Sequence, residues 1–91
     1  MGDHTVRCMA FSWADFAERP GAVPVYVQLA NWVADAIAQG NLAPGTKLPA
    51  ERDLAEQIGH SAETVARARR LLVDRGLLES AVGRGTFVSS N

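Results

Sequence analysis

The chain is poor in the features that mark secreted, membrane-spanning or disulfide-bonded proteins. Among its 91 residues Cys8 is the only cysteine, so an intramolecular disulfide is impossible. No apolar run approaches the length of a membrane span. The N-terminus also lacks the basic and then apolar layout of a signal peptide. These absences predict a cytoplasmic protein with no membrane partner.

Residues that could perform chemistry are few and scattered. His4, Cys8 and His60 do not have the spacing of a metal site. No catalytic Ser/His/Asp or Cys/His arrangement stands out, and Glu51 and Asp53 fall on different faces of a helix. The sequence therefore predicts a protein that is not an enzyme, with no metal site and no cofactor.

Positive charge is not in excess overall, but it is unevenly distributed. The net charge of −1 argues against indiscriminate binding to polyanions. From Thr64 to the end, however, five arginines stand against two acidic residues, whereas residues 1–63 carry four positive and eight negative groups. This asymmetry is typical of a neutral body with one basic face.

Residues 1–22 are interpreted as an N-terminal arm. Ser12 is placed to cap a short helix through Glu18, and the Pro20-Gly21 pair ends that helix. The arm contains three aromatic residues, Phe11, Trp13 and Phe16. Two interpretations stay open: the arm packs on the core, or it contacts a second copy or another partner.

Residues 23–91 begin with two predicted helices. The first has Pro24 in its first turn and ends at Gly40. Its apolar residues recur at helical spacing: Tyr26, Leu29, Trp32, Val33, Ala36 and Ile37. A connector, residues 41–48, leads to a second helix that opens at Pro49. This helix turns Leu54, Ala55 and Ile58 inward and ends at Gly59.

A third helix follows after a turn of only a few residues. Ser61 can cap its start, and Gly76 ends it. Its inward face is Val65, Ala68 and Leu72, and its outward face is Glu63, Ala66, Arg67 and Arg70. A short glycine-containing turn between two short helices indicates a helix-turn-helix.

Two short strands, residues 77–81 and 86–89, are predicted on either side of the turn Gly83-Arg84-Gly85. The fold is therefore expected to be mostly α with a small β-hairpin. It is a winged helix-turn-helix, with a three-helix core, a β-wing and a short N-terminal helical arm.

The outward face of the third helix is a candidate DNA-reading surface. A helix fits the major groove of B-DNA, where arginines such as Arg67 and Arg70 can contact guanine or phosphate. Glu63, four residues before Arg67, can hold that guanidinium or accept from a cytosine amino group. The alternative is an ordinary solvated helix face.

Further cations lie on the wing and before the second helix. Arg84, between Gly83 and Gly85, can enter a narrow minor groove, although the same residues also describe a simple hairpin turn. Arg52 can donate to a phosphate or form an intrahelical pair with Glu56. Lys47 is a phosphate candidate of lower specificity.

Residues 24–88 resemble the winged-helix domain of the GntR family of bacterial transcription regulators, most nearly its YtrA-type branch. The resemblance rests on matching residues at fixed spacing: Pro24-Val25-Tyr26, Gly45, Leu48-Pro49-Ala50-Glu51-Arg52, Leu54-Ala55, Ser61, Thr64-Val65, Ala68, Leu72, Gly76-Leu77 and Gly83-Arg84-Gly85-Thr86-Phe87-Val88. It implies a sequence-specific transcription regulator that binds a palindromic double-stranded operator as a homodimer. It also implies a third helix in the major groove and a wing tip at the minor groove. The implied DNA contacts are Arg52, Ser61, Thr64, Arg67 and Gly83, with a phosphate contact at Lys47.

The chain departs from that family pattern in places. Ala62 and Ala66 stand where the family often has arginine, and Arg69 replaces an apolar or aromatic residue. These departures imply that base recognition has moved along the helix or that affinity is low. Ala62, Ala66 and the acidic N-terminal part support the alternative of a winged-helix protein-interaction module with weak or lost DNA binding, while the DNA-binding regulator stays the favoured interpretation. The chain also stops just past the wing, as an excised domain or a minimal protein would. No small-molecule effector can be inferred, and the free chain is expected to be mainly monomeric in dilute solution.

Overall fold

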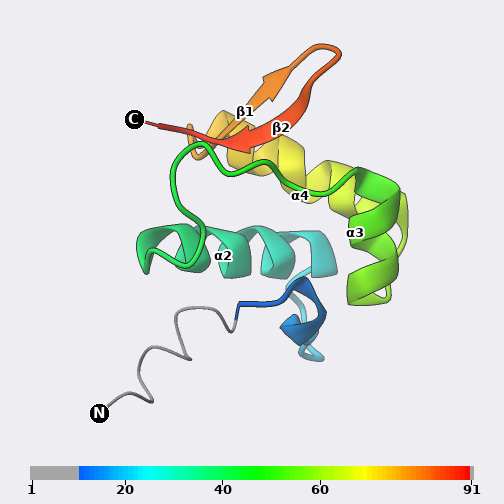
Figure 1. Cartoon of the computed structure of the whole chain (residues 1–91). Coiled ribbons are helices and arrows are strands. Elements are labelled where there is room, and N and C mark those ends of the chain that lie inside the picture. The colour runs from blue at the N-terminus through cyan, green and yellow to red at the C-terminus, as the bar shows by residue number, and fades with distance from the viewer. Residues whose placement is uncertain (1–10, 91) are drawn as a thin grey trace.

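The structure, a computed structural model, describes residues 11–90. Helices come first along the chain and a β-hairpin follows them (Figure 1). The elements in chain order are a 3-10 turn η1 (Trp13–Asp15), helices α2 (Val25–Ala38), α3 (Glu51–Ile58) and α4 (Ala62–Asp74), and strands β1 (Leu78–Ala81) and β2 (Gly85–Val88). The predicted fold, a helix-turn-helix with a wing, is confirmed.

The turn between α3 and α4 follows from two local signals in the sequence. Gly59 ends α3 in the left-handed conformation, with φ of 78°, which costs a glycine little. Ser61 then begins α4, because its hydroxyl accepts from the backbone N–H of Thr64 at 3.2 Å. Both predicted boundaries are confirmed.

The expected start of α3 at Pro49 is wrong by two residues, since the helix begins at Glu51. The reason lies in the preceding segment. The N–H of Leu48 donates to the carbonyl of Thr86 at 2.8 Å, and Ala50 is still extended, with ψ of 152°. Pairing with the wing therefore keeps the chain extended until Ala50.

The arm helix expected to run through Glu18 is also shorter than predicted. Only Trp13–Asp15 forms a 3-10 turn, although Ser12 does cap it by accepting from the N–H of Ala14 at 3.2 Å. Phe16 leaves the turn in an extended conformation and is only 7% exposed. The turn therefore ends where the chain directs the Phe16 ring into the core.

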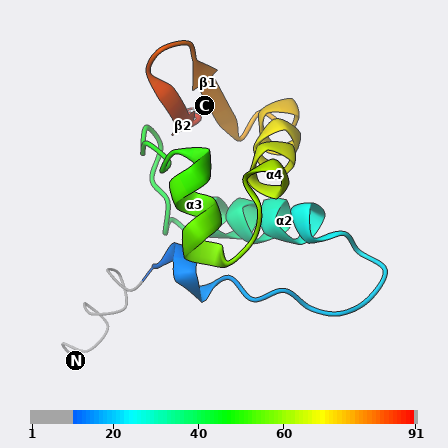
Figure 2. The same cartoon turned by 90° about the vertical axis from the view of Figure 1, so that its right-hand side faces the viewer.

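Aromatic side chains fix the arm to the helical core. Trp32 of α2 stacks on Phe11 with ring centroids 5.2 Å apart, and it meets Phe16 edge-on at 5.5 Å. Trp13 meets Trp32 at 6.0 Å. Figure 2 shows the arm running beneath α2 and α3. Within residues 11–16 the arm therefore packs on the core, while residues 1–10 of the predicted arm lie outside the described residues.

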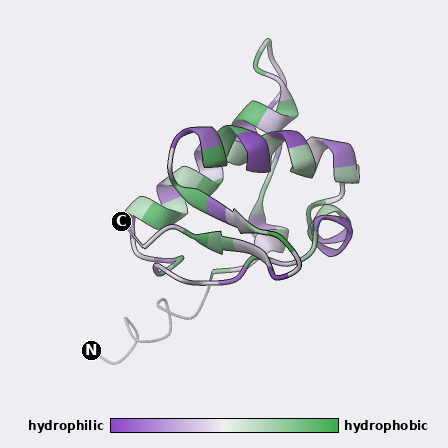
Figure 3. Ribbon diagram, turned by 90° about the horizontal axis from the view of Figure 1, so that it is seen from above, coloured by the Kyte–Doolittle hydropathy of each residue, from purple (hydrophilic) through white to green (hydrophobic). Residues whose placement is uncertain are grey.

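The core forms where the apolar faces of α2, α3 and α4 meet the wing. Leu29, Leu72 and Val88 are its most completely buried large side chains. Figure 3 shows hydrophilic and hydrophobic residues alternating along the helices, as amphipathic helices require. The wing is an antiparallel pair in which Leu78 lies opposite Val88 and Ala81 opposite Gly85.

The connector between α2 and α3 adds a third extended segment to the wing. Leu48 donates to Thr86, and the N–H of Val88 donates to the carbonyl of Thr46 at 2.8 Å. Lys47 lies opposite Phe87 in an antiparallel bridge. β2 is therefore paired on both edges, which anchors the wing to the segment just before α3.

Candidate nucleic-acid interface

The outward face of α4 presents an ion pair and an unpaired arginine. The Nη2 of Arg67 donates to Oε2 of Glu63 at 2.9 Å, and the two side chains are 57% and 73% exposed. Such an exposed pair stabilises the helix little, and in the structure it directs the guanidinium of Arg67 toward Glu63. Arg70 is exposed and has no ion pair within residues 11–90. The predicted pairing of Glu63 with Arg67 is confirmed.

A second contact to Arg67 comes from α2. The guanidinium carbon lies 5.9 Å from the ring centroid of Tyr26, within the range of a cation–π contact. The sequence interpretation placed Tyr26 only on the apolar face of its helix. The structure shows Tyr26 half-buried at the edge of this surface. The only sequence signal for that position is its hydroxyl group, which makes a tyrosine suited to a partly exposed site.

Two hydroxyl side chains, Ser61 and Thr64, interact at the capped N-terminus of α4. The Oγ of Ser61 and the Oγ1 of Thr64 are 3.1 Å apart, in addition to the capping bond from the Thr64 N–H. Ser61 is exposed and Thr64 is half-buried. The first turn of α4 is thus held by its own cap, with Glu63 beside it on the exposed surface.

The tip of the wing is a three-residue turn, closed by the N–H of Arg84 donating to the carbonyl of Ala81 at 3.0 Å. Gly83 has φ of 77°, a value that favours glycine. Arg84 is exposed and has no ion pair with any described residue. Val82, which the sequence interpretation passed over, is fully exposed at this tip.

Lys47 lies beside the wing rather than on an isolated connector. A Cβ at position 85 would come within 3.0 Å of the Lys47 Cε, so the missing side chain of Gly85 gives the lysine its place. Gly85 itself has φ of 113°. The third extended segment therefore brings Lys47 next to the wing, an arrangement that spacing in the sequence does not predict.

Arg52 of α3 and Arg69 of α4 both lie near the start of α3, but they differ in whether an acidic side chain pairs with them. Arg52 is exposed, and the alternative pair with Glu56 does not form among the described residues. Arg69, by contrast, donates from Nε to Oε2 of Glu51 at 2.6 Å and is half-buried. Arg52 is thus available to an external anion, while Arg69 joins α4 to α3.

The described residues hold no group of three His, Cys, Asp or Glu side chains arranged for a metal ion. His4 and Cys8, two of the residues weighed for such a site, lie outside the described residues. Within residues 11–90, no helix combines the length and apolar character needed to cross a membrane.

Sequence comparison matches residues 25–88 to the family described as "Bacterial regulatory proteins, gntR family". The HTH-type transcriptional regulator Rv1152 of Mycobacterium tuberculosis is 47% identical over 66 residues, which cover 72% of this chain and 54% of that protein. The HTH-type transcriptional repressor NagR of Bacillus subtilis is 46% identical over 67 residues, which cover 74% of this chain and 28% of that protein. The chain thus spans about half the length of the first of these relatives and less of the second.

Solved structures with the same architecture include YtrA from Sulfolobus acidocaldarius, a GntR-family transcription factor. Its TM-score is 0.74 at 38% identity, and the match covers 78% of this chain and 74% of that chain. The DNA-binding domain of AraR, solved in complex with operator ORX1, has a TM-score of 0.71 at 36% identity. That match covers 81% of this chain and 93% of that chain.

Proposed function

Because this chain belongs to the GntR family of bacterial regulatory proteins, we propose that it binds double-stranded DNA sequence-specifically and regulates transcription. One observation carries the proposal. Among the exposed arginines of α4 and the wing, Arg70 and Arg84 have no acidic partner in the described residues, and Arg67 has only Glu63. These arginines lie on a fold similar to the AraR DNA-binding domain, which was solved in complex with its operator. Arginines in this state are suited to contact phosphates and base edges.

In the proposed complex, α4 enters the major groove. Arg67 reads a base edge, because its guanidinium lies on the outward face between Glu63 and Tyr26 and Ala66 clears space beside it. Arg70 lies one turn further along the same face and contacts a base or a phosphate. Glu63 is close enough to the same groove to accept from a cytosine amino group.

The wing and the segments beside it contact the DNA backbone and the minor groove. Arg84 enters the minor groove from the glycine turn, where Gly83 and Gly85 allow close approach. Lys47 and Arg52 donate to phosphates. The hydroxyls of the capping pair, Ser61 and Thr64, lie where the start of α4 meets the backbone.

Two copies are proposed to assemble on a two-fold symmetric operator, each reading one half-site. A dimer on DNA places the two α4 helices in successive major grooves on one side of the duplex. This symmetry predicts an inverted repeat in any sequence selected for binding.

Selection of bound DNA from a random duplex pool, using the full chain, tests the proposal. An enriched inverted repeat is expected, with affinity that falls steeply as salt rises because several phosphates are neutralised. Failure to enrich any sequence, together with salt-independent association with proteins, would instead indicate an interaction module.

A further inference from the structure

The turn of the wing carries an apolar side chain that the fold does not use. Val82 is fully exposed, so its methyl groups are open to solvent. Figures 1 and 2 show the hairpin extending away from the helices, with its turn at the free end. Single exposed valines are common on protein surfaces. This one differs because it stands at the end of the wing that is proposed above to meet DNA.

The geometry of the turn does not require a valine. The N–H of Arg84 donates to the carbonyl of Ala81 at 3.0 Å, and of the two central residues only Gly83 has a positive φ. That pattern belongs to a type II turn, in which the restricted residue is the third and not the second. A polar residue at position 82 would therefore serve the hairpin equally well and would be better hydrated. The chain instead has a β-branched apolar side chain there, with few rotamers to lose on binding.

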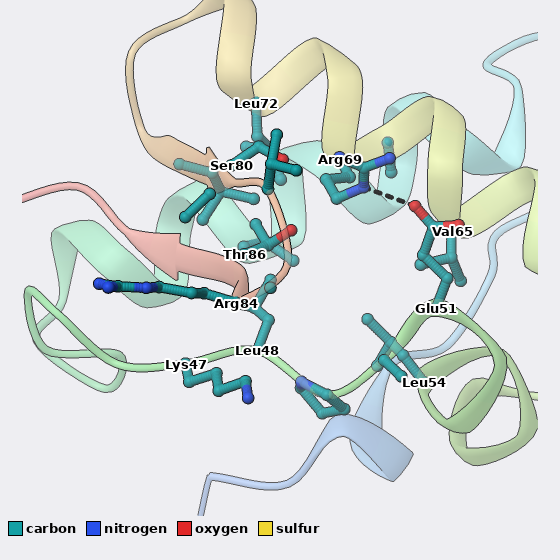
Figure 4. A pocket seen from close by; sticks show the side chains of 18 of the residues that line it. Lys47, Leu48, Glu51, Leu54, Val65, Arg69, Leu72, Ser80, Arg84 and Thr86 are labelled. Carbon is teal, nitrogen blue, oxygen red and sulfur yellow. Dashed lines mark hydrogen bonds and ion pairs between the residues drawn. The ribbon is translucent and has the colours of Figure 1, made fainter.

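Unneutralised positive charge lies beside this apolar side chain. Arg84 is two residues beyond Val82 and has no ion pair with any described residue. Figure 4 shows its side chain extending away from the Arg69–Glu51 pair, which is marked by a dashed line. A polyanion that binds the free charge of the wing therefore also brings its own surface against Val82.

We propose that Val82 makes the wing selective against G·C base pairs in the minor groove, an inference that rests on the DNA-binding function proposed above. In that groove A·T and T·A pairs present acceptors only, whereas a G·C pair adds the N2 amino group of guanine, a donor. The methyl groups of Val82 cannot accept a hydrogen bond. Contact with a G·C pair therefore buries that amino group without a partner, and an A·T or T·A pair has no such group to bury.

Val82 and Arg84 respond to different properties of the groove. Arg84 responds to the negative potential of a narrow groove, which depends on a run of several base pairs. Val82 responds to one chemical group on one base pair, and it does not distinguish A·T from T·A because both present the same acceptors. The expected signature is a position outside the half-sites read by α4 where A·T is accepted in either orientation and G·C is rejected.

Base analogues test this contact on the parent chain, with no substitution in the protein. On the operator obtained by selection, each A·T pair that flanks the half-sites is exchanged in turn for T·A, G·C, inosine·C or diaminopurine·T. Inosine·C lacks the amino group in the minor groove, and diaminopurine·T adds it to an A·T pair. At the Val82 position, G·C and diaminopurine·T should weaken binding about tenfold, as one buried donor without a partner does. T·A and inosine·C should stay within about twofold of A·T.

Val82→Thr separates the effect of the valine from the shape of the groove. Threonine keeps the β-branched shape, and its hydroxyl can accept from the guanine amino group. The tenfold rejection of G·C and diaminopurine·T should therefore fall below about threefold, because the donor regains a partner. The melting temperature should not change, since position 82 is exposed. Val23→Thr alters the other exposed large hydrophobic residue among those described, in the loop before α2, and should keep the selectivity of the parent.

The outcomes separate this inference from the DNA-binding function itself. Loss of selectivity in Val82→Thr, with tight binding to the A·T operator retained, supports Val82 as a specificity-determining residue. Tight operator binding with equal affinity for A·T and G·C at every flanking position overturns the inference and leaves the DNA-binding function intact. Parent-like selectivity in Val82→Thr also overturns it, because the preference then comes from Arg84 and the width of the groove. Failure to bind any duplex overturns both.

Discussion

The face that carries the arm packs its aromatic rings against the core, whereas the face formed by α4 and the wing leaves cations exposed. On the arm face, Trp32 contacts three other rings, and His60 lies 3.4 Å from a carboxylate oxygen of Glu18. On the other face, Arg70 and Arg84 have no acidic partner within residues 11–90. The contrast indicates that the arm face contributes to the core, whereas the other face carries the cations assigned above to the proposed DNA interface.

The turn between α3 and α4 lies between these two faces. Its residues contact the arm on one side and begin α4 on the other. His60 follows the Gly59 cap and meets the ring of Phe16 edge-on at 6.0 Å, while Ser61 starts α4. Packing of the arm therefore supports the turn from which α4 departs. Loss of the arm's anchor should lower stability first and DNA binding only through unfolding.

The largest effect is expected for Phe16→Ala, which deletes a buried ring from the arm. The free energy of unfolding should fall by roughly 3–5 kcal/mol, as for other buried Phe-to-Ala changes. Thermal and urea unfolding followed by circular dichroism would measure it. A drop of less than about 1 kcal/mol, a surface-like change, would show that the arm does not belong to the core.

Arg67→Ala should act on the opposite face, with little effect on stability because the pair with Glu63 is exposed. Affinity for the selected operator should fall by roughly 1–3 kcal/mol, and preference should relax at one position in each half-site. Binding to operator and to scrambled duplex across a salt series measures both. An equal loss on the two duplexes would assign Arg67 to a phosphate.

Arg84→Ala should cost less, since a wing tip supplies one contact. At moderate salt, loss of this one cation from the minor groove should weaken binding roughly fivefold and lower the salt slope by about one. The melting temperature should stay close to that of the parent because the side chain is exposed. Parent-like affinity at every salt concentration would remove this residue from the DNA-binding surface.

The smallest effect is expected for Glu18→Gln, which removes the partner of His60 on the arm face. Because Glu18 is 47% exposed, the loss of stability should stay within about 1 kcal/mol. DNA affinity should not change. A drop in affinity without a matching drop in stability would show that the arm face also takes part in DNA binding, and the contrast between the two faces would fail.

The order and kind of the helices and strands were predictable from the sequence because their signals are local. Apolar spacing placed Val65, Ala68 and Leu72 on one side of α4, and all three are buried. Gly59 and Ser61 marked the helix ends through conformations that depend on neighbouring residues only. The Glu63–Arg67 pair was predictable for the same reason, since both residues lie on one helix at i,i+4 spacing.

Contacts between residues distant in sequence were decided by the tertiary structure alone. Pairing of the connector with β2 delayed the start of α3 and brought Lys47 beside Gly85. The contacts of Arg69 with Glu51 and of Arg67 with Tyr26 likewise join separate helices. The sequence alone determined a helix-turn-helix with a wing and an outward face of arginines. Only tertiary packing decided that Arg69 is neutralised by Glu51 and that Lys47 lies beside the wing, because these contacts depend on distances that no local pattern contains.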